Sequence, residues 1–328
     1  MAETSGLLNR RTTQVVPRVR IPLSPPYKKY ENYTNIKTML KGSIPAIITP
    51  FSKGEVDFDS FAKLLKWQIK EGISGVTVCG TTGESPTLTH DEHMQLVEFA
   101  VKVAGRKIPV IAGTGSNSTK EAIEFTKHAY KSGANYGLVV TPYYNKPNQK
   151  GLVNHFKKIA KVTPLKQIIY NIPGRSIVDL TYDSFKELNK ISNIVGIKDA
   201  SNDLSRPLVM RTFMKKNFNY ISGEDGTIAG YLAQGGHGCI SVTANVAPRL
   251  TSKLHYYWQT KNYKQFDLIN LKLAPLSQVL FSEPSPTPSK YALSLMGKCK
   301  ADVREPLTDL SPETKKQVRK VLKDLNFI

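Results

Sequence analysis

Long hydrophobic runs and cysteines are both scarce in this sequence of 328 residues. No apolar run approaches the ~20 residues of a membrane-spanning helix, and the longest, such as 44–51 and 137–140, have the length of strands. The three cysteines, Cys79, Cys239 and Cys299, lie far apart and form no CxxC motif. This spacing argues against a disulfide framework and a zinc site, and it favours a reducing compartment, the cytoplasm. The lack of a long apolar run predicts no membrane partner.

Acidic residues are also few: 26 Asp and Glu stand against 46 Lys and Arg, which gives a formal net charge of +20. Nucleic-acid-binding proteins often gather their basic side chains into one stripe, whereas the lysines here are spread along every predicted helix. We therefore predict no nucleic-acid partner, and the charge would serve a small anionic substrate equally well.

Residues 1–38 lack apolar periodicity and are rich in arginine and proline. They fit either an Arg-rich targeting segment or a stretch upstream of the true initiator. Met39 directly precedes "LKGSIPAIITPF", where the strand pattern begins. This position favours Met39 as the start of the folded protein, with residues 1–38 as a disordered extension outside the fold.

Short apolar runs alternate with helical periodicity from residue 44 onward. Eight strands are expected, at 44–49, 75–79, 109–112, 137–141, 167–171, 194–198, 219–222 and 238–243. Helix-length segments separate them, as at 59–72, 90–105 and 118–133. This α/β pattern is typical of a (β/α)8 TIM barrel. A doubly wound open sheet is the alternative. No GxGxxG motif, which would support it, follows the first strand.

The sequence turns helical after residue 246, at 247–260, 263–280, 287–297 and 311–326. That is more helix than an eighth unit needs. We therefore predict a barrel catalytic domain over 39–262, followed by a small C-terminal helical appendage over 263–328.

The strand in "NIVGIKDAS" (193–201) ends on Lys198. Taken alone, a lysine at a strand tip is most simply exposed to solvent. The chemistry of such barrels, however, gathers at the carboxyl ends of the strands. The unusual segments follow those ends: GTTGES (80–85), GTGSN (113–117), TPYYNKP (141–147), YNIPGR (170–175), SGED (222–225) and SVTAN (241–245). Because they converge on one mouth, the buried interpretation of Lys198 is favoured.

A lysine inside that mouth is suited to Schiff-base chemistry. An unperturbed amine is neutral in only about one molecule in 2,500 at pH 7, and desolvation of an amine increases that fraction. The neutral amine condenses with a carbonyl, and the iminium is an electron sink that needs no cofactor.

Partners for this chemistry are present, each with a plainer alternative. The GTTGE turn suits a small carboxylate, or is an ordinary βα turn. Tyr170 is suited to proton relay, or is a core aromatic. Arg175 is suited to grip a second carboxylate, or is a surface arginine.

Six segments together carry a resemblance over residues 40–328: GTTGES, TPYYNKP, YNIPGR, GIKDAS, GGHGCISVTAN and EPSPTPSKYAL. With them the sequence resembles the dihydrodipicolinate synthase family, pyruvate-dependent class I aldolases with a TIM-barrel fold. The resemblance implies a Schiff base between Lys198 and pyruvate, a relay of Tyr170, Thr81 and Tyr144, and no cofactor or metal. Tyr144 would reach in from the neighbouring subunit. The implied substrate-binding residues are Thr81 and Thr82 for the pyruvate carboxylate, Arg175 for aspartate semialdehyde, and Gly223 and Ile240 through their backbones.

The implied reaction condenses pyruvate with L-aspartate 4-semialdehyde to 4-hydroxy-tetrahydrodipicolinate, on the diaminopimelate route to lysine. The implied assembly is a homotetramer, a dimer of dimers. The alternatives are a lyase for N-acetylneuraminate or sugar acids, and a catalytically silent barrel that binds ligands. The paired threonines and Arg175 favour the synthase.

Two histidines open the predicted helix at 90–105, where Thr89 and Glu92 form a capping-box pattern. His90 and His93 share a face, but their spacing lacks the gap of four of a HExxH site, so they are either solvated first-turn residues or part of another site. In lysine-inhibited members of the resembled family, matching positions line an interface pocket for lysine. These positions are Ser85, Pro86, His90, His93, Asn117, Glu121 and Tyr143.

Overall fold

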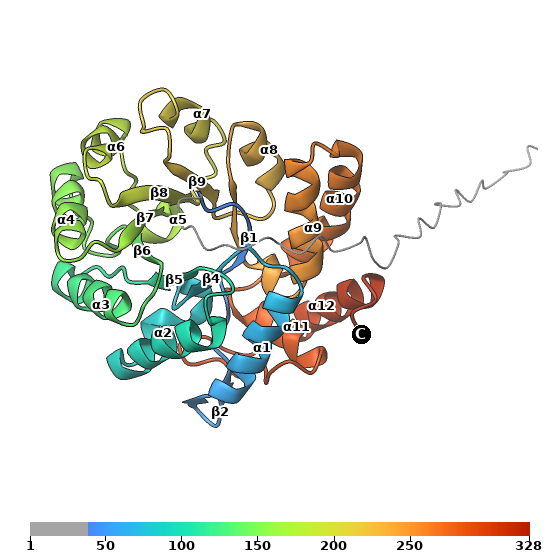
Figure 1. Ribbon diagram of the computed structural model, residues 1–328. Coiled ribbons are helices and arrows are strands. Elements are labelled where there is room, and N and C mark those ends of the chain that lie inside the picture. The colour runs from blue at the N-terminus through green and yellow to red at the C-terminus, as the bar shows by residue number, and fades with distance from the viewer. Residues whose placement is uncertain (1–38) are drawn as a thin grey trace, which may run out of the picture. The chain divides into compact units, whose positions relative to one another are not determined.

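The computed structural model describes residues 39–328, so the predicted disordered extension lies outside the described residues. Within this range eight parallel strands form one sheet, in the order β1-β10-β9-β8-β7-β6-β5-β4 (Figure 1). A parallel bridge between Ala46 and Thr77 joins its two edges. The strands are β1 (Gly42–Pro45), β4 (Val76–Val78), β5 (Val110–Gly113), β6 (Tyr136–Val140), β7 (Lys166–Asn171), β8 (Ile194–Asp199), β9 (Asn219–Ser222) and β10 (Gly238–Ser241). The predicted barrel is confirmed.

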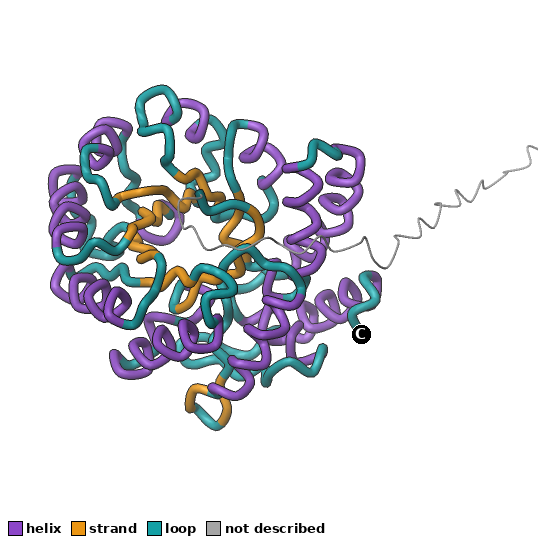
Figure 2. The backbone as a smooth tube through the Cα atoms, viewed as in Figure 1, coloured by secondary structure: helices purple, strands orange, loops and turns teal. Residues whose placement is uncertain are grey.

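Helices surround this barrel, which Figure 2 shows as a ring of strands inside a ring of helices. Its strands are almost entirely buried, since residues on one face fill the interior and residues on the other pack against helices. The helices that follow strands β1 to β9 are α1 (Phe58–Lys70), α2 (His90–Ala104), α3 (Thr119–Lys131), α4 (Gln149–Lys161), α5 (Pro173–Ser176), α6 (Tyr182–Asn189), α7 (Arg206–Met210) and α8 (Ile228–Ala233).

The first strand differs from its prediction at 44–49, because β1 ends at Pro45. Beyond it the backbone finds other partners: the Ile48 amide donates to the side chain of Asn245, 3.1 Å away. A small hairpin that the sequence analysis missed follows, with β2 (Phe51–Ser52) and β3 (Glu55–Val56). Its turn places Lys53 and Gly54 at positive φ.

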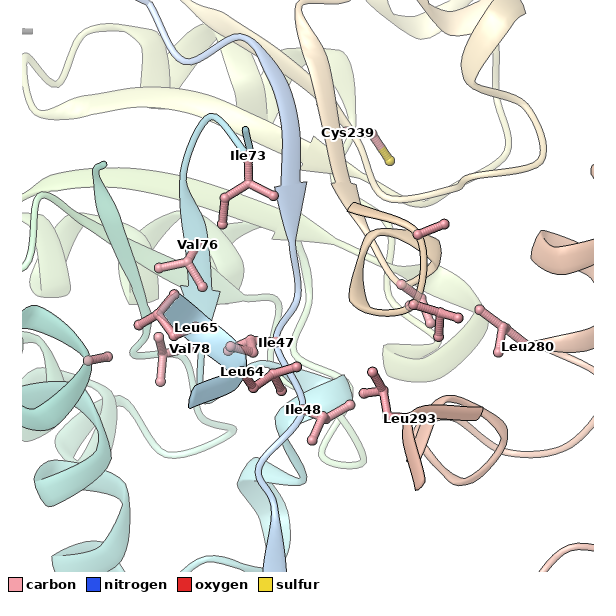
Figure 3. Close-up of a cluster of buried hydrophobic side chains, with 14 of the residues drawn as sticks. Ile47, Ile48, Leu64, Leu65, Ile73, Val76, Val78, Cys239, Leu280 and Leu293 are labelled. Atoms are coloured by element: carbon pink, nitrogen blue, oxygen red, sulfur yellow. The ribbon is translucent and has the colours of Figure 1, made fainter. Parts of the chain in front are cut away.

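The C-terminal helices were predicted and are present: α9 (Pro248–Gln259), α10 (Tyr263–Val279), α11 (Thr287–Leu295) and α12 (Pro312–Asp324). They pack on the barrel through apolar side chains. Figure 3 shows Leu280 and Leu293 in the same buried cluster as Ile47 and Ile48. The domain boundary between residues 262 and 263 stays a prediction.

Helix α2 begins with the predicted capping box. The Thr89 hydroxyl accepts from the Glu92 amide at 3.2 Å, and the Thr89 amide donates to the Glu92 carboxylate at 2.8 Å. This cap fixes where α2 starts, shortly after η2 of the GTTGES region. Among residues 39–328 there is no helix with the length and apolar character needed to cross a membrane.

Candidate active site

Lys198 and Tyr170 lie side by side inside the barrel. They are directly paired in the register of β7 and β8, so both side chains project at the same level. The Lys198 Nζ lies 4.0 Å from the centroid of the Tyr170 ring. Lys198 is 6% exposed and Tyr170 5%. The solvent-exposed interpretation of Lys198 is therefore wrong.

Gly223 leaves the space that the lysine occupies. A Cβ atom at this position would lie 3.1 Å from Lys198 Cε and 2.8 Å from the Cβ of Ala200. Any larger residue would crowd the amine. Ile240 belongs, with Tyr170, to the apolar cluster that fills the barrel interior. Two predicted substrate-binding residues thus share the interior with the lysine–tyrosine pair.

The GTTGES segment forms two tight turns after β4, η1 (Thr81–Gly83) and η2 (Ser85–Thr87). We call residues 80–87 the threonine loop. Thr82 is buried and Thr81 half-buried, and the hydroxyl of Thr49 donates to the Gly83 carbonyl at 2.7 Å. The loop is therefore anchored from inside the barrel.

Arg175 lies in α5 and is exposed. The next residue, Ser176, is buried, accepts a hydrogen bond from the Thr141 hydroxyl at 2.9 Å, and donates to the Ile172 carbonyl at 2.9 Å. Arg175 thus stands on an anchored backbone, with its guanidinium free to meet a ligand.

Glu224 is a residue of the mouth to which the sequence analysis gave no role, although it had singled out SGED. Burial raises the pKa of the Glu224 carboxyl, and the charges of Lys198 and Arg175 oppose this shift. A half-buried carboxylate therefore lies in the field of the predicted Schiff-base lysine and of the arginine predicted to bind the second substrate.

Tyr144 is the one predicted relay residue whose ring lies in solvent, with 89% of it exposed. Its φ is +71°, an uncommon conformation for tyrosine. The next side chain, Asn145, donates to the Asn117 carbonyl at 2.9 Å. We call residues 141–147 the tyrosine loop.

Four residues of the predicted lysine pocket, His90, His93, Glu121 and Tyr143, lie near one another. His90 Nε2 lies 2.6 Å from the Glu121 carboxylate. Ser116, which lies in the singled-out segment GTGSN, interacts with both Glu121 and Tyr143. Burial, and to a lesser degree the charge of Glu121, raises the pKa of Tyr143. Ser85 and Asn117 are half-buried, while Pro86 is exposed.

His93 is not the solvated first-turn residue that one interpretation proposed. It is 3% exposed and stacks on Phe125, with ring centroids 4.0 Å apart. Burial lowers the pKa of His93 to about 4. Phe125 was missed, although it lies one helical turn after Glu121 and so shares its face.

A second set of missed residues lies behind the active pair. Asp199 and Asn171 follow Lys198 and Tyr170, so their side chains point to the outer face of the barrel. The buried Arg206 lies 3.5 Å from the Asp199 carboxylate and 2.8 Å from that of Asp179. Asn171 donates to Asp179 at 2.8 Å. This network ties together the ends of β7 and β8.

The described part of the chain holds no group of three or more His, Cys, Asp or Glu side chains arranged to bind a metal ion. The fold and the enclosed amine fit a class of barrel lyases that hold a carbonyl substrate on a lysine.

Comparison with known proteins narrows this class. The model of the dihydrodipicolinate synthetase family matches residues 39–325, and the chain belongs to this family. The 4-hydroxy-tetrahydrodipicolinate synthase of Bradyrhizobium diazoefficiens is 49% identical over 286 residues, which cover 87% of this chain and 97% of that relative. The predicted enzyme class, a lyase with 4-hydroxy-tetrahydrodipicolinate synthase activity, is confirmed.

Solved structures agree with this assignment. The dihydrodipicolinate synthase of Acinetobacter baumannii, in complex with pyruvate, is 44% identical with a TM-score of 0.85, covering 88% of this chain and 100% of that one. The corresponding enzyme of Cyanidioschyzon merolae, with lysine bound, is 35% identical with a TM-score of 0.85, covering 88% and 99%.

Proposed function

We propose that the chain condenses pyruvate with L-aspartate 4-semialdehyde through a Schiff base on Lys198. The observation that carries this proposal is the enclosed pair of β7 and β8, with the Lys198 amine 4.0 Å from the Tyr170 ring centroid. Its near-complete burial keeps water away from an imine that water would hydrolyse.

The amine attacks the carbonyl carbon of pyruvate, and water leaves to give the iminium. Loss of a methyl proton then gives an enamine, whose carbon attacks the aldehyde. The amino group of the second substrate finally displaces Lys198 from the iminium carbon and closes the ring of 4-hydroxy-tetrahydrodipicolinate. The iminium formed on Lys198 serves as the electron sink, so we propose that no cofactor takes part.

The other mouth residues have roles that fit their surroundings. Thr81 and Thr82 hold the pyruvate carboxylate, and Gly223 and Ile240 contact pyruvate through their backbones. Tyr170, Thr81 and Tyr144 of a neighbouring subunit relay protons. Arg175 binds the carboxylate of the semialdehyde through a bidentate, charge-assisted contact.

We also propose that lysine inhibits the enzyme at the cluster of Glu121, His90, His93 and Tyr143. The Glu121 carboxylate and the exposed Tyr143 phenol suit an ammonium group, and the Cyanidioschyzon merolae relative carries lysine in its solved structure. Ser85, Pro86 and Asn117 complete this pocket. We further propose a homotetramer, built as a dimer of dimers, that acts in the cytoplasm, where the three free thiols stay reduced.

Borohydride trapping tests the central claim. The protein is reduced in the presence of pyruvate, digested and mapped; we expect a reduced pyruvyl adduct on Lys198 alone. Lys198→Ala should abolish the adduct, whereas Lys215→Ala, a matched change of another partly buried lysine, should keep it. An adduct elsewhere, or none, contradicts the assignment.

A coupled assay distinguishes this synthase activity from the alternative, a lyase for N-acetylneuraminate or sugar acids. The protein is supplied with pyruvate and aspartate semialdehyde, and separately with N-acetylneuraminate. We expect turnover only in the first case, because Arg175 is suited to a short substrate that carries a carboxylate. Cleavage of N-acetylneuraminate alone would favour the sugar-acid lyase, and no turnover in either assay would favour the silent barrel.

A further inference from the structure

A second buried lysine lies outside the barrel interior, on α11 of the C-terminal region. Lys290 is 0% exposed, and its Nζ lies 2.5 Å from the carboxylate of Glu84, which is 2% exposed. The same ammonium donates to the Asp302 carbonyl at 2.7 Å. Burial lowers the pKa of Lys290, and the charge of Glu84 opposes this shift. Two charges removed from water carry a large desolvation cost, which demands close pairing.

Glu84 is the residue that joins the two turns of the threonine loop. It has φ +55° and ψ +36°, the left-handed conformation that non-glycine residues seldom adopt. Its amide donates to the Thr81 carbonyl at 3.0 Å, and its carbonyl accepts from the Thr87 amide at 3.0 Å. The conformation of Glu84 therefore sets the direction in which Thr81 and Thr82 face.

Arg304 holds the same carboxylate from the other side of the ion pair. Its amide donates to Glu84 Oε2 at 2.9 Å, while its guanidinium donates to the Thr87 carbonyl at 2.8 Å. Arg304 Cζ and Lys290 Nζ lie 4.4 Å and 3.9 Å from the centroid of the Phe51 ring. The Arg304 guanidinium itself pairs with the Glu92 carboxylate of α2. The Glu84 carboxylate thus meets the Lys290 ammonium and the Arg304 backbone amide, and both cations lie against the Phe51 ring.

The C-terminal helices also dock on the barrel through apolar side chains. Leu293, three residues after Lys290, is fully buried in the main apolar cluster together with Leu280 (Figure 3). Leu276 belongs to the same cluster. Apolar contact of this extent is sufficient reason for the helices to dock. A buried ion pair in addition to it therefore calls for a separate explanation, because pairs of this kind can confer specificity of geometry more than stability.

We propose that Lys290 and Glu84, supported by Arg304, are positioning residues that orient the threonine loop for the pyruvate carboxylate. This inference rests on the proposed function, in which Thr81 and Thr82 bind that carboxylate. Lys290 touches no substrate. It acts through Glu84 on the turn that carries the threonines.

The test compares removal of both charges with removal of packing alone. Glu84→Gln/Lys290→Met takes away the ion pair while keeping side-chain volume, so the fold avoids an unpaired buried charge. Leu293→Ala, on the same helix, removes apolar contact and leaves the pair intact. Three quantities are measured for each variant and for the parent protein. The first is the pyruvate concentration at which formation of the borohydride-trapped adduct is half-maximal. The others are the KM values for pyruvate and for aspartate semialdehyde, and Tm.

We expect the double variant to keep a Tm within a few degrees of the parent. Its half-saturating pyruvate concentration and its KM for pyruvate should rise about tenfold, as for loss of one oriented hydrogen bond to a carboxylate, with the KM for aspartate semialdehyde unchanged. Leu293→Ala should lower Tm and leave both KM values as they are.

Three results would overturn the positioning role: an unchanged pyruvate half-saturation in the double variant, an equal rise of both KM values, or an equal rise for Leu293→Ala. Lys290→Met alone adds a check, since it should raise the pyruvate KM at least as much as the double variant if it folds. A parent protein that forms no pyruvate adduct overturns the proposed function instead, so the two failures are distinguishable.

Discussion

The threonine loop follows β4 and the tyrosine loop follows β6, with β5 between them at the same barrel mouth, yet the two loops are held in opposite ways. The threonine loop is anchored by Thr49 from inside and by Lys290 and Arg304 from the C-terminal region. The tyrosine loop presents Tyr144 to solvent at positive φ. One loop is organised by its own chain, whereas the other carries an aromatic ring that its own chain does not cover.

This difference matters for catalysis because a proton relay demands fixed geometry. A threonine on a loop whose neighbouring residues, Gly83, Glu84 and Thr87, are held by other parts of the chain meets this demand within one chain. An exposed tyrosine meets it only after something packs around its ring. The comparison therefore predicts that changes in the tyrosine loop affect turnover with little effect on folding.

The largest effect is expected for Tyr144→Phe, which removes one hydroxyl from the relay. Positioned acid–base groups contribute roughly 10²–10⁴-fold, so kcat should fall at least a hundredfold. Tm should not change, because the ring makes little contact within its chain. Steady-state rates and a thermal melt check this. A lowered Tm would contradict the contrast between the two loops.

A mixing experiment sharpens the same point. Tyr144→Phe and Lys198→Ala subunits are co-expressed. If Tyr144 serves the partner's site, each mixed dimer has one intact site, and random pairing recovers about a quarter of parental activity. If Tyr144 serves its own chain, both sites of a mixed dimer are defective and no activity returns.

Arg175 belongs to neither loop, but its backbone is tied to the tyrosine loop through Ser176 and Thr141. Arg175→Ala should reduce kcat/KM for aspartate semialdehyde about ten- to a hundredfold, as for loss of one charge-assisted contact. Formation of the pyruvate adduct should be largely unaffected. An equal loss of adduct formation would mean that Arg175 is structural.

The carboxylate of Glu121 lies 2.6 Å from Nε2 of His90, the first residue of α2. Glu121→Ala should raise the inhibitory concentration of lysine about tenfold, since it removes one charged contact to the ammonium group. Uninhibited turnover should stay nearly the same. Calorimetry and initial rates measure both. Coupling is reciprocal, so pyruvate should change lysine affinity by the factor by which lysine changes pyruvate affinity.

The smallest effect concerns His93, which is buried against the ring of Phe125. Its folded pKa of about 4 lies below the unfolded value of 6.5, so unfolding takes up a proton between these pH values. Its stabilising contribution is complete above pH 6.5 and is lost as pH falls toward 4. Urea unfolding at several pH values gives the free energy of unfolding as a function of pH. Between about pH 4 and 6.5 this free energy should rise less steeply with pH in His93→Asn than in the parent protein, by about 1.4 kcal/mol per pH unit.

An unchanged pH dependence of the free energy of unfolding in His93→Asn would contradict this role of the buried His93 imidazole.

Local patterns were sufficient to predict the barrel and the convergence of Lys198, Tyr170 and the loop segments at its mouth, whereas the roles of Tyr144, Gly223 and Ile240 were implied only by the family resemblance. Apolar strand periodicity located all eight strands, and helical periodicity located the four C-terminal helices. Since strand ends of a parallel barrel meet at one rim, the quoted loop segments, Lys198 and Tyr170 were predicted to converge. The capping box at Thr89 was readable because it depends on residues three positions apart.

Contacts between residues far apart in the sequence were decided only by the tertiary structure. Nothing in the spacing of Glu84, Lys290 and Arg304 pairs them, since more than two hundred residues separate the first from the other two. The burial of His93 against Phe125 and the solvent exposure of Tyr144 likewise follow from packing between elements. Periodicity reports which face of an element is buried; which charged group meets which, inside that burial, depends on how the closed barrel and its C-terminal helices fit together.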